Sequence, residues 1–103
     1  MFKKKFCNNL KLPSIGLGCG INGYFKSHIN YKNFNFLVSK SIELGSNLID
    51  SSPIYGNGES EIIIGKAIRS IRKNVILATK ILPESTSFSG VIKSLELSLK
   101  RLK

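Results

Sequence analysis

The sequence contains few residues that crosslink a chain or bind a metal. It has two cysteines, Cys7 and Cys19, and a single histidine among 103 residues. These are too few for a disulfide framework or for a zinc site built from cysteine and histidine. We therefore expect no metal centre, and the low cysteine content is typical of a protein from a reducing, cytoplasmic compartment.

Long hydrophobic runs are also missing. The basic residues 3–5 resemble the start of a signal peptide, but residues 6–9 interrupt the apolar stretch that would have to follow. No later stretch is long and apolar enough to span a bilayer. We expect no association with a membrane.

Acidic residues are scarce, because six Asp and Glu stand against 16 Lys and Arg, giving a formal net charge of +10. Such an excess can attract phosphate-bearing partners. The lysines are nevertheless spread along the chain, and no basic patch is interleaved with aromatic residues as in nucleic-acid binding proteins. We expect no specific nucleic-acid partner, while a small non-enzymatic basic binding module remains an alternative interpretation.

What the sequence does contain is an alternation of short apolar segments and amphipathic helices. Asn8 and Asn9 could turn a small hairpin at the start. The pattern then predicts strands at 12–18, 47–50 and 74–79, separated by helices at about 33–44, 60–71 and 91–102. The order β-α-β-α-β-α predicts a parallel sheet with right-handed crossovers, and therefore an α/β fold.

Three details of these elements can be checked in the structure. Ser60 is the predicted N-cap of the second helix, and Gly45 the predicted end of the first. The strand at 74–79 is expected to be buried on both faces. The buried stripe of the third helix is expected to consist of Val91, Leu95, Leu99 and Leu102.

Polar and glycine residues follow each predicted strand. Gly18, Asp50 and Lys80 lie at the carboxyl ends of the three strands, which parallel pairing brings to one edge of the sheet. That edge is the catalytic face of a (β/α)₈ barrel and the ligand crevice of an open doubly wound sheet. Periodicity alone does not separate these two folds.

The segment from Gly18 to Gly23 matches the pattern G-x-G-x-x-G of dinucleotide-binding folds. In those folds a helix begins inside the glycine run, so that its amides meet the pyrophosphate. Here polar residues follow the glycines, which favours a long loop after a barrel strand.

The run from Gly45 to Ala67 resembles the signature of the aldo-keto reductase family, in which G-x-N-x-x-D is followed after four residues by Y-G, then by an acidic helix start and G-x-A. Residues 75–80, V-I-L-A-T-K, are similar to the strand that delivers the family's lysine. The resemblance implies the N-terminal three β-α units of a truncated (β/α)₈ TIM barrel, with residues 1–103 as one partial NADP-dependent oxidoreductase domain.

The resemblance also implies roles for individual residues. Tyr55 would donate a proton to the substrate carbonyl, Lys80 would make that phenol a stronger acid, and Asp50 would hold Lys80 in place. Gly18, Cys19 and Gly20, together with Asp50, would lie beside the nicotinamide of NADP(H). In physical terms, a phenol is too weak an acid for fast protonation near neutrality unless a cation stabilises its conjugate base.

A complete barrel needs about 250 residues, and the sequence ends before a fourth strand. In the family this strand delivers a histidine that orients the substrate carbonyl, and most phosphate-binding loops for the cofactor come later still. We therefore expect the isolated chain to be inactive and to self-associate through unpaired strand edges. A barrel fragment that associates with another chain is the remaining alternative.

Overall fold

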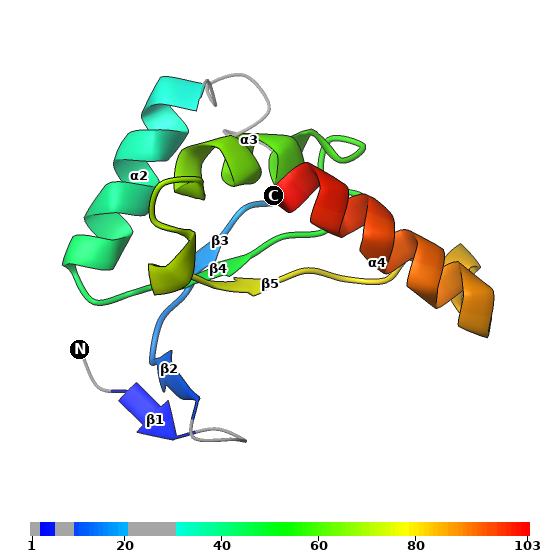
Figure 1. Ribbon diagram of the computed structural model, residues 1–103. Helices are drawn as coiled ribbons and strands as arrows, with labels where there is room; N and C mark the ends of the chain where they lie inside the picture. The colour runs from blue at the N-terminus through cyan, green and yellow to red at the C-terminus, as the bar shows by residue number, and fades with distance from the viewer. Residues whose placement is uncertain (1–2, 6–9, 21–30) are drawn as a thin grey trace.

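Three strands come first and then helices and strands alternate in this computed structural model, which describes residues 3–5, 10–20 and 31–103 (Figure 1). The elements are β1 (Lys3–Lys5), β2 (Lys11–Pro13), β3 (Leu17–Gly18), α2 (Tyr31–Glu43), β4 (Leu48–Asp50), α3 (Glu59–Ile68), β5 (Ile76–Ala78) and α4 (Phe88–Leu102), with 3-10 turns η2 (Arg72–Asn74) and η3 (Pro83–Ser85). None of the helices in these residues combines the length and the apolar character needed to cross a bilayer.

The parallel sheet has the order β3-β4-β5, with the β4 strand in the middle. Its register pairs Gly18 with Asp50, and Asp50 with Ala78. The carboxyl ends of the three strands therefore lie side by side, as the sequence predicts. We call this edge of the sheet the rim.

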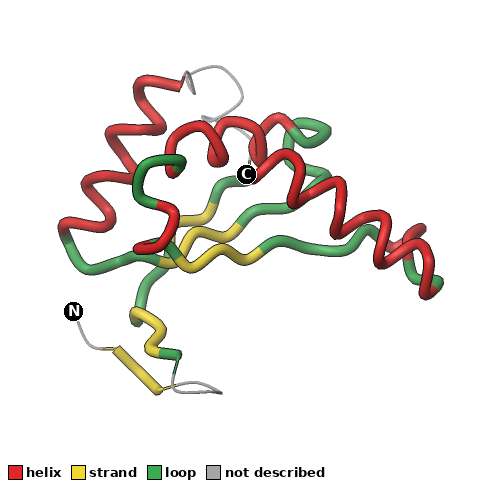
Figure 2. The backbone as a smooth tube through the Cα atoms, in the orientation of Figure 1, coloured by secondary structure: helices red, strands yellow, loops and turns green. Residues whose placement is uncertain are grey.

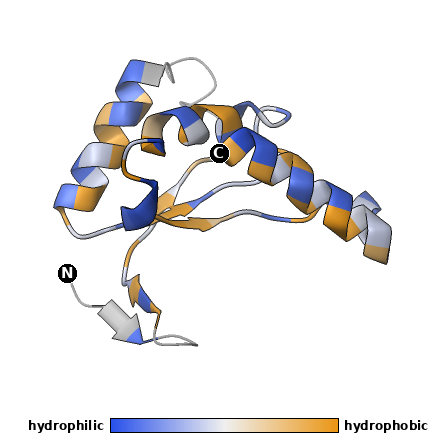
Figure 3. Ribbon diagram, viewed as in Figure 1, coloured by the Kyte–Doolittle hydropathy of each residue, from blue (hydrophilic) through white to orange (hydrophobic). Residues whose placement is uncertain are grey.

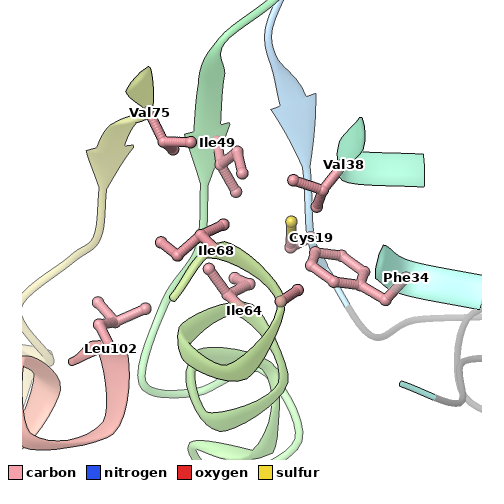
Figure 4. Packing of buried hydrophobic residues seen from close by; sticks show 9 residues of the cluster. Cys19, Phe34, Val38, Ile49, Ile64, Ile68, Val75 and Leu102 are labelled. Carbon is pink, nitrogen blue, oxygen red and sulfur yellow. The ribbon is translucent and has the colours of Figure 1, made fainter. Parts of the chain in front are cut away.

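The hydrophobic core lies between this sheet and the helices α2 and α3, which are on the same side of the strands (Figure 2). Ile49, at the centre of the sheet, is 1% exposed. Figure 4 shows it facing Ile64 and Ile68 of α3, while Phe34 and Val38 of α2 lie beside Cys19 at β3. The strands of the parallel sheet are largely apolar, whereas α2 and α4 carry both polar and apolar residues along their length (Figure 3).

The predicted first strand is wrong as a single element. Residues Lys11–Pro13 form β2, which pairs antiparallel with β1, and only Leu17–Gly18 join the parallel sheet. The chain bends between them, and Ile15 is 65% exposed instead of buried. Pro13 explains the break, because a proline has no backbone N–H to continue a ladder. The hairpin is thus present, although its predicted turn at Asn8 and Asn9 lies outside the described residues.

The start of α3 also differs from the prediction. Gly58, in the left-handed region at φ 87°, precedes the helix, and no side chain caps it. Ser60 lies inside the helix and is buried, and its hydroxyl donates to the carbonyl oxygen of Cys19 at 3.0 Å. A tertiary partner has therefore replaced the local capping interaction. Gly45 ends α2 as predicted, with φ 86°.

The predicted buried stripe of α4 is wrong in its middle part. Leu95 and Leu99 are 42% and 57% exposed, whereas Ser94 and Ser98 are buried. Gly65 of α3 explains this, because a Cβ there would collide with the backbone carbonyl oxygen of Arg101. This contact orients α4, and Ser98 and Ser94 lie about one and two turns before the buried Leu102 on the same face.

The strand β5 is only half-buried, although the sequence predicts burial on both faces. It is an edge strand of the described sheet, so one of its sides has no neighbouring strand. Burial of β5 on both faces would require further elements packed against the sheet, and the described residues do not provide them.

Candidate active site

Asp50 and Lys80 form an ion pair at the rim. Lys80 Nζ lies 2.8 Å from Asp50 Oδ2 and 3.0 Å from Asp50 Oδ1. The same ammonium group donates to the carbonyl oxygen of Ser51 at 2.8 Å. Because Asp50 pairs with Ala78 in the sheet, Lys80 lies two residues past that pair and reaches back over the neighbouring strand end.

Tyr55 completes this group from the loop after β4. The Lys80 ammonium lies 5.1 Å from the centroid of the tyrosine ring, within the range of a cation–π contact. Gly20 lies near the same ring, because a Cβ at this position would be 3.8 Å from Tyr55 Cζ. The loops after all three strands of the sheet therefore meet around one phenol ring.

A run of left-handed residues holds the tyrosine loop in place. Gly56, Asn57 and Gly58 have φ values of 59°, 54° and 87°. Glycine and asparagine are the residues that adopt this region at low cost. The run reverses the chain directly after Tyr55 and leads it into α3, so the glycines of the Y-G-N-G segment set the position of the phenol.

The electrostatics of the rim favour a charged lysine. Desolvation lowers the pKa of Lys80, but its hydrogen bonding to Asp50 and its interaction with Tyr55 together outweigh that effect, so the pKa lies above its ordinary value of 10.5. The side chain therefore presents an ammonium group at neutral pH. Both Lys80 and Asp50 are 45% exposed, so a ligand can approach the pair.

Gly18, Cys19 and Gly20 differ in how they face the rim. A Cβ at Gly18 would meet nothing within 4 Å, so the rim is open there. Cys19 is 1% exposed and its thiol belongs to the hydrophobic core. Burial, followed by the charge of Asp50, raises the pKa of this thiol to about 12, although Lys80 opposes the shift. Cys19 thus offers the rim only its backbone, whose N–H donates to the Asp50 carbonyl at 2.9 Å.

A second buried cluster supports the rim, and sequence reasoning did not find it. Glu61 is 0% exposed and accepts hydrogen bonds from Thr79 Oγ1 at 2.7 Å and from Arg101 Nε at 2.6 Å. Thr79 directly precedes Lys80, so the cluster holds the backbone that carries the lysine. The acidic start of α3 was the only sequence signal, and it does not show which element supplies the partner.

The long loop predicted from Gly18 to Gly23 is described only as far as Gly20, and residues 21–30 lie outside the described part. No helix begins before that point. Within the described residues, no group of three or more His, Cys, Asp or Glu side chains is arranged to hold a metal.

Comparison with known proteins identifies the class of protein. The model of the aldo/keto reductase family matches residues 14–103. The chain therefore belongs to this family, as the motif around Asp50 and Tyr55 predicts. It is 32% identical to the methylglyoxal reductase YeaE of Escherichia coli over 95% of its own length and 34% of that protein. It is 36% identical to the aldo-keto reductase YhdN of Bacillus subtilis over 90% of its own length and 31% of that protein.

Solved structures agree with this assignment. The thermostable aldo-keto reductase Tm1743 superposes with a TM-score of 0.84 at 30% identity, covering 99% of this chain and 39% of that one. An aldo-keto reductase from Klebsiella pneumoniae in complex with NADPH superposes with a TM-score of 0.78 at 30% identity, covering 99% of this chain and 36% of that one. The expected fold class, three β-α units of a (β/α)₈ barrel, is confirmed. The chain spans about a third of the length of the relatives it matches.

Proposed function

We propose that this chain supplies the proton-donating half of an NADP-dependent reductase site, which transfers hydride between NADP(H) and a carbonyl or alcohol substrate. The observation that carries the proposal is the Lys80 ammonium, which contacts both the Asp50 carboxylate and the Tyr55 ring at the rim. When bound, the cofactor supplies the hydride to the carbonyl carbon.

In this proposal the catalytic work of the chain is proton transfer. Tyr55 Oη donates its proton to the carbonyl oxygen as the hydride arrives at the carbon, and a neutral alcohol results. The Lys80 ammonium stabilises the phenolate that remains. Asp50 keeps the ammonium group beside the ring and preserves its charge. In the reverse direction the phenolate removes the hydroxyl proton of the alcohol.

The residues proposed to adjoin the cofactor are Gly18, Cys19, Gly20 and Asp50. The open space at Gly18 and the closeness of Gly20 to the Tyr55 ring support this assignment, since side chains there would fill the space beside the phenol. The Klebsiella pneumoniae relative is a complex with NADPH, which supports NADP(H) as the cofactor. We further propose that most of the cofactor's phosphate-binding site is not part of this chain, and that the isolated chain is inactive.

A chimera tests the proposal directly. Residues 14–103 would replace the matching segment of YeaE, and NADPH oxidation would be followed with methylglyoxal, the substrate in that relative's name. We expect turnover, and a loss of about 10²- to 10⁴-fold on Tyr55→Phe, the usual value of a general acid. A folded chimera whose turnover is unchanged by Tyr55→Phe would contradict the proposed role. Turnover by the 103-residue chain alone would contradict its proposed inactivity.

A second candidate is a non-enzymatic fragment that associates with a copy of itself. It is favoured by an apolar row on the outer face of α4, in which Phe88, Ile92, Leu95 and Leu99 are 87%, 45%, 42% and 57% exposed. Such rows at helical spacing are typical of helix–helix contacts. Sedimentation over a range of concentrations tests this candidate: Phe88→Ser with Leu99→Ser should shift a dimer to monomer, and a monomeric parent chain would refute it.

A further inference from the structure

A basic groove of about 600 Å³ lies between α3 and α4. Six of its lining residues are cationic and none is acidic: Lys66, Arg69, Arg72, Lys100, Arg101 and Lys103. These residues come from two parts of the chain about 30 positions apart, so the groove exists only in the folded protein. It shares no residue with the Asp50, Tyr55 and Lys80 group.

Gly65 creates the floor of the groove. A Cβ at this position would overlap the carbonyl oxygen of Arg101 and would lie 3.0 Å from the Cα of Leu102. The backbones of α3 and α4 are in contact here, and the longer lining side chains border the groove on both sides. No side chain can fill the floor, so the opening is a property of the helix contact.

The positive charge of the groove is only partly compensated by neighbouring groups. Arg101 is neutralised by Glu61, and Lys66 has interactions of its own. Arg69, Arg72, Lys100 and Lys103 then remain, although Arg72 also donates to the Val75 carbonyl oxygen at 3.1 Å. The carboxyl ends of the two helices contribute about half a negative charge each. The terminal carboxylate of Lys103 adds one full negative charge in the 103-residue chain, so the surplus is close to two positive charges.

One wall of the groove is apolar. Ile62 and Leu97 line it and are 41% and 45% exposed. Together with the cations, this wall suits a ligand with a strongly anionic end and an apolar or aromatic end. The volume falls within the range of about 300–1,000 Å³ that is usual for small-molecule sites.

We propose that this groove is a binding site for a small polyphosphate that carries an aromatic or apolar group, of the nucleoside polyphosphate class. Arg69, directly after the end of α3, and Lys100 of α4 hold the phosphates, and Ile62 and Leu97 contact the nucleoside. The site is separate from the reductase rim, and it gives the net charge of +10 a specific use.

The test is calorimetric titration of the 103-residue chain with ATP and with inorganic tripolyphosphate at fixed ionic strength. The double variant Arg69→Ala and Lys100→Ala should raise the Kd for both probes at least about tenfold, since each charge-assisted hydrogen bond contributes on that order. The control is Lys11→Ala with Lys32→Ala, which removes the same charge outside the groove and should change the Kd less than about twofold. Equal weakening by the two double variants would show attraction by net charge alone and would overturn the proposal.

Two further measurements separate the parts of the ligand. Leu97→Ser should raise the Kd for ATP but leave the Kd for tripolyphosphate unchanged. Equal affinities of the parent chain for the two probes would overturn the proposal that the groove binds the nucleoside. A short single-stranded RNA that binds more tightly than ATP, and loses binding in the Arg69 and Lys100 variant, would assign the groove to nucleic acid instead. Thermal unfolding of each variant verifies that the chain is folded.

Discussion

Replacing Arg101 by Met should destabilise the protein more than a typical surface substitution. Glu61 is fully buried, and its carboxylate has two partners in the structure, Arg101 Nε at 2.6 Å and Thr79 Oγ1 at 2.7 Å. The arginine side chain is 25% exposed, while the glutamate side chain is 0% exposed. The substitution removes the only cationic partner that the described structure shows for this carboxylate and leaves a buried charge with a single neutral hydrogen bond.

The magnitude follows from that burial. Breaking a buried ion pair by removing one partner costs about 3–5 kcal/mol, because the other charge stays desolvated. Small domains have free energies of unfolding of about 5–15 kcal/mol. Arg101→Met should therefore remove a large part of the stability, and urea denaturation followed by circular dichroism at neutral pH would measure it.

A second substitution distinguishes the buried charge from lost packing. Glu61→Gln in the Arg101→Met background removes the charge but keeps an oxygen that can accept from Thr79. We expect it to recover most of the lost free energy. A loss below about 1 kcal/mol in Arg101→Met, or no recovery in the double variant, would refute the argument that Arg101 compensates a buried carboxylate.

Three further predictions concern the rim and the core. Folding raises the pKa of Lys80, so the stability that the Lys80 ammonium contributes is complete below the unfolded pKa of 10.5 and is lost as the pH rises through the folded pKa. In denaturation measurements, the difference in free energy of unfolding between the parent chain and Lys80→Met should therefore shrink above the folded pKa. The Cys19 thiol, with a pKa of about 12, should react with a disulfide reagent at pH 8 only after unfolding, measured in Cys7→Ser; rapid reaction in the native state would contradict its burial. Gly65→Ala should cost about 1–3 kcal/mol by overpacking, whereas Gly18→Ala, where a Cβ meets nothing within 4 Å, should unfold at nearly the parent's denaturant concentration.

Local patterns in the sequence were enough to predict the order of elements and the position of the rim residues. Strand and helix periodicities depend on residues close together in the chain. Parallel pairing then requires the strand ends to share one edge, so Asp50 and Lys80 could be placed near each other before any coordinates. The contact of Tyr55 with Lys80 follows from the same register and from the left-handed turn at residues 56–58.

The burial of particular faces could not be predicted in this way. The apolar pattern of α4 pointed to Leu95 and Leu99, but the close approach of Gly65 turned Ser94 and Ser98 inward. Whether a serine caps a helix or binds a distant carbonyl depends on what lies opposite it, as Ser60 shows. Such outcomes require the packed structure, because they are decided by distances between residues far apart in the chain.

The sequence by itself determined the alternating α/β order and the family signature, since both are encoded in neighbouring residues. Only the tertiary structure decided that Glu61 is buried against Arg101, 40 positions away, and that cations from α3 and α4 line one groove. The physical reason is that charge–charge energy depends on separation in space and on desolvation. Neither quantity exists until the helices have packed.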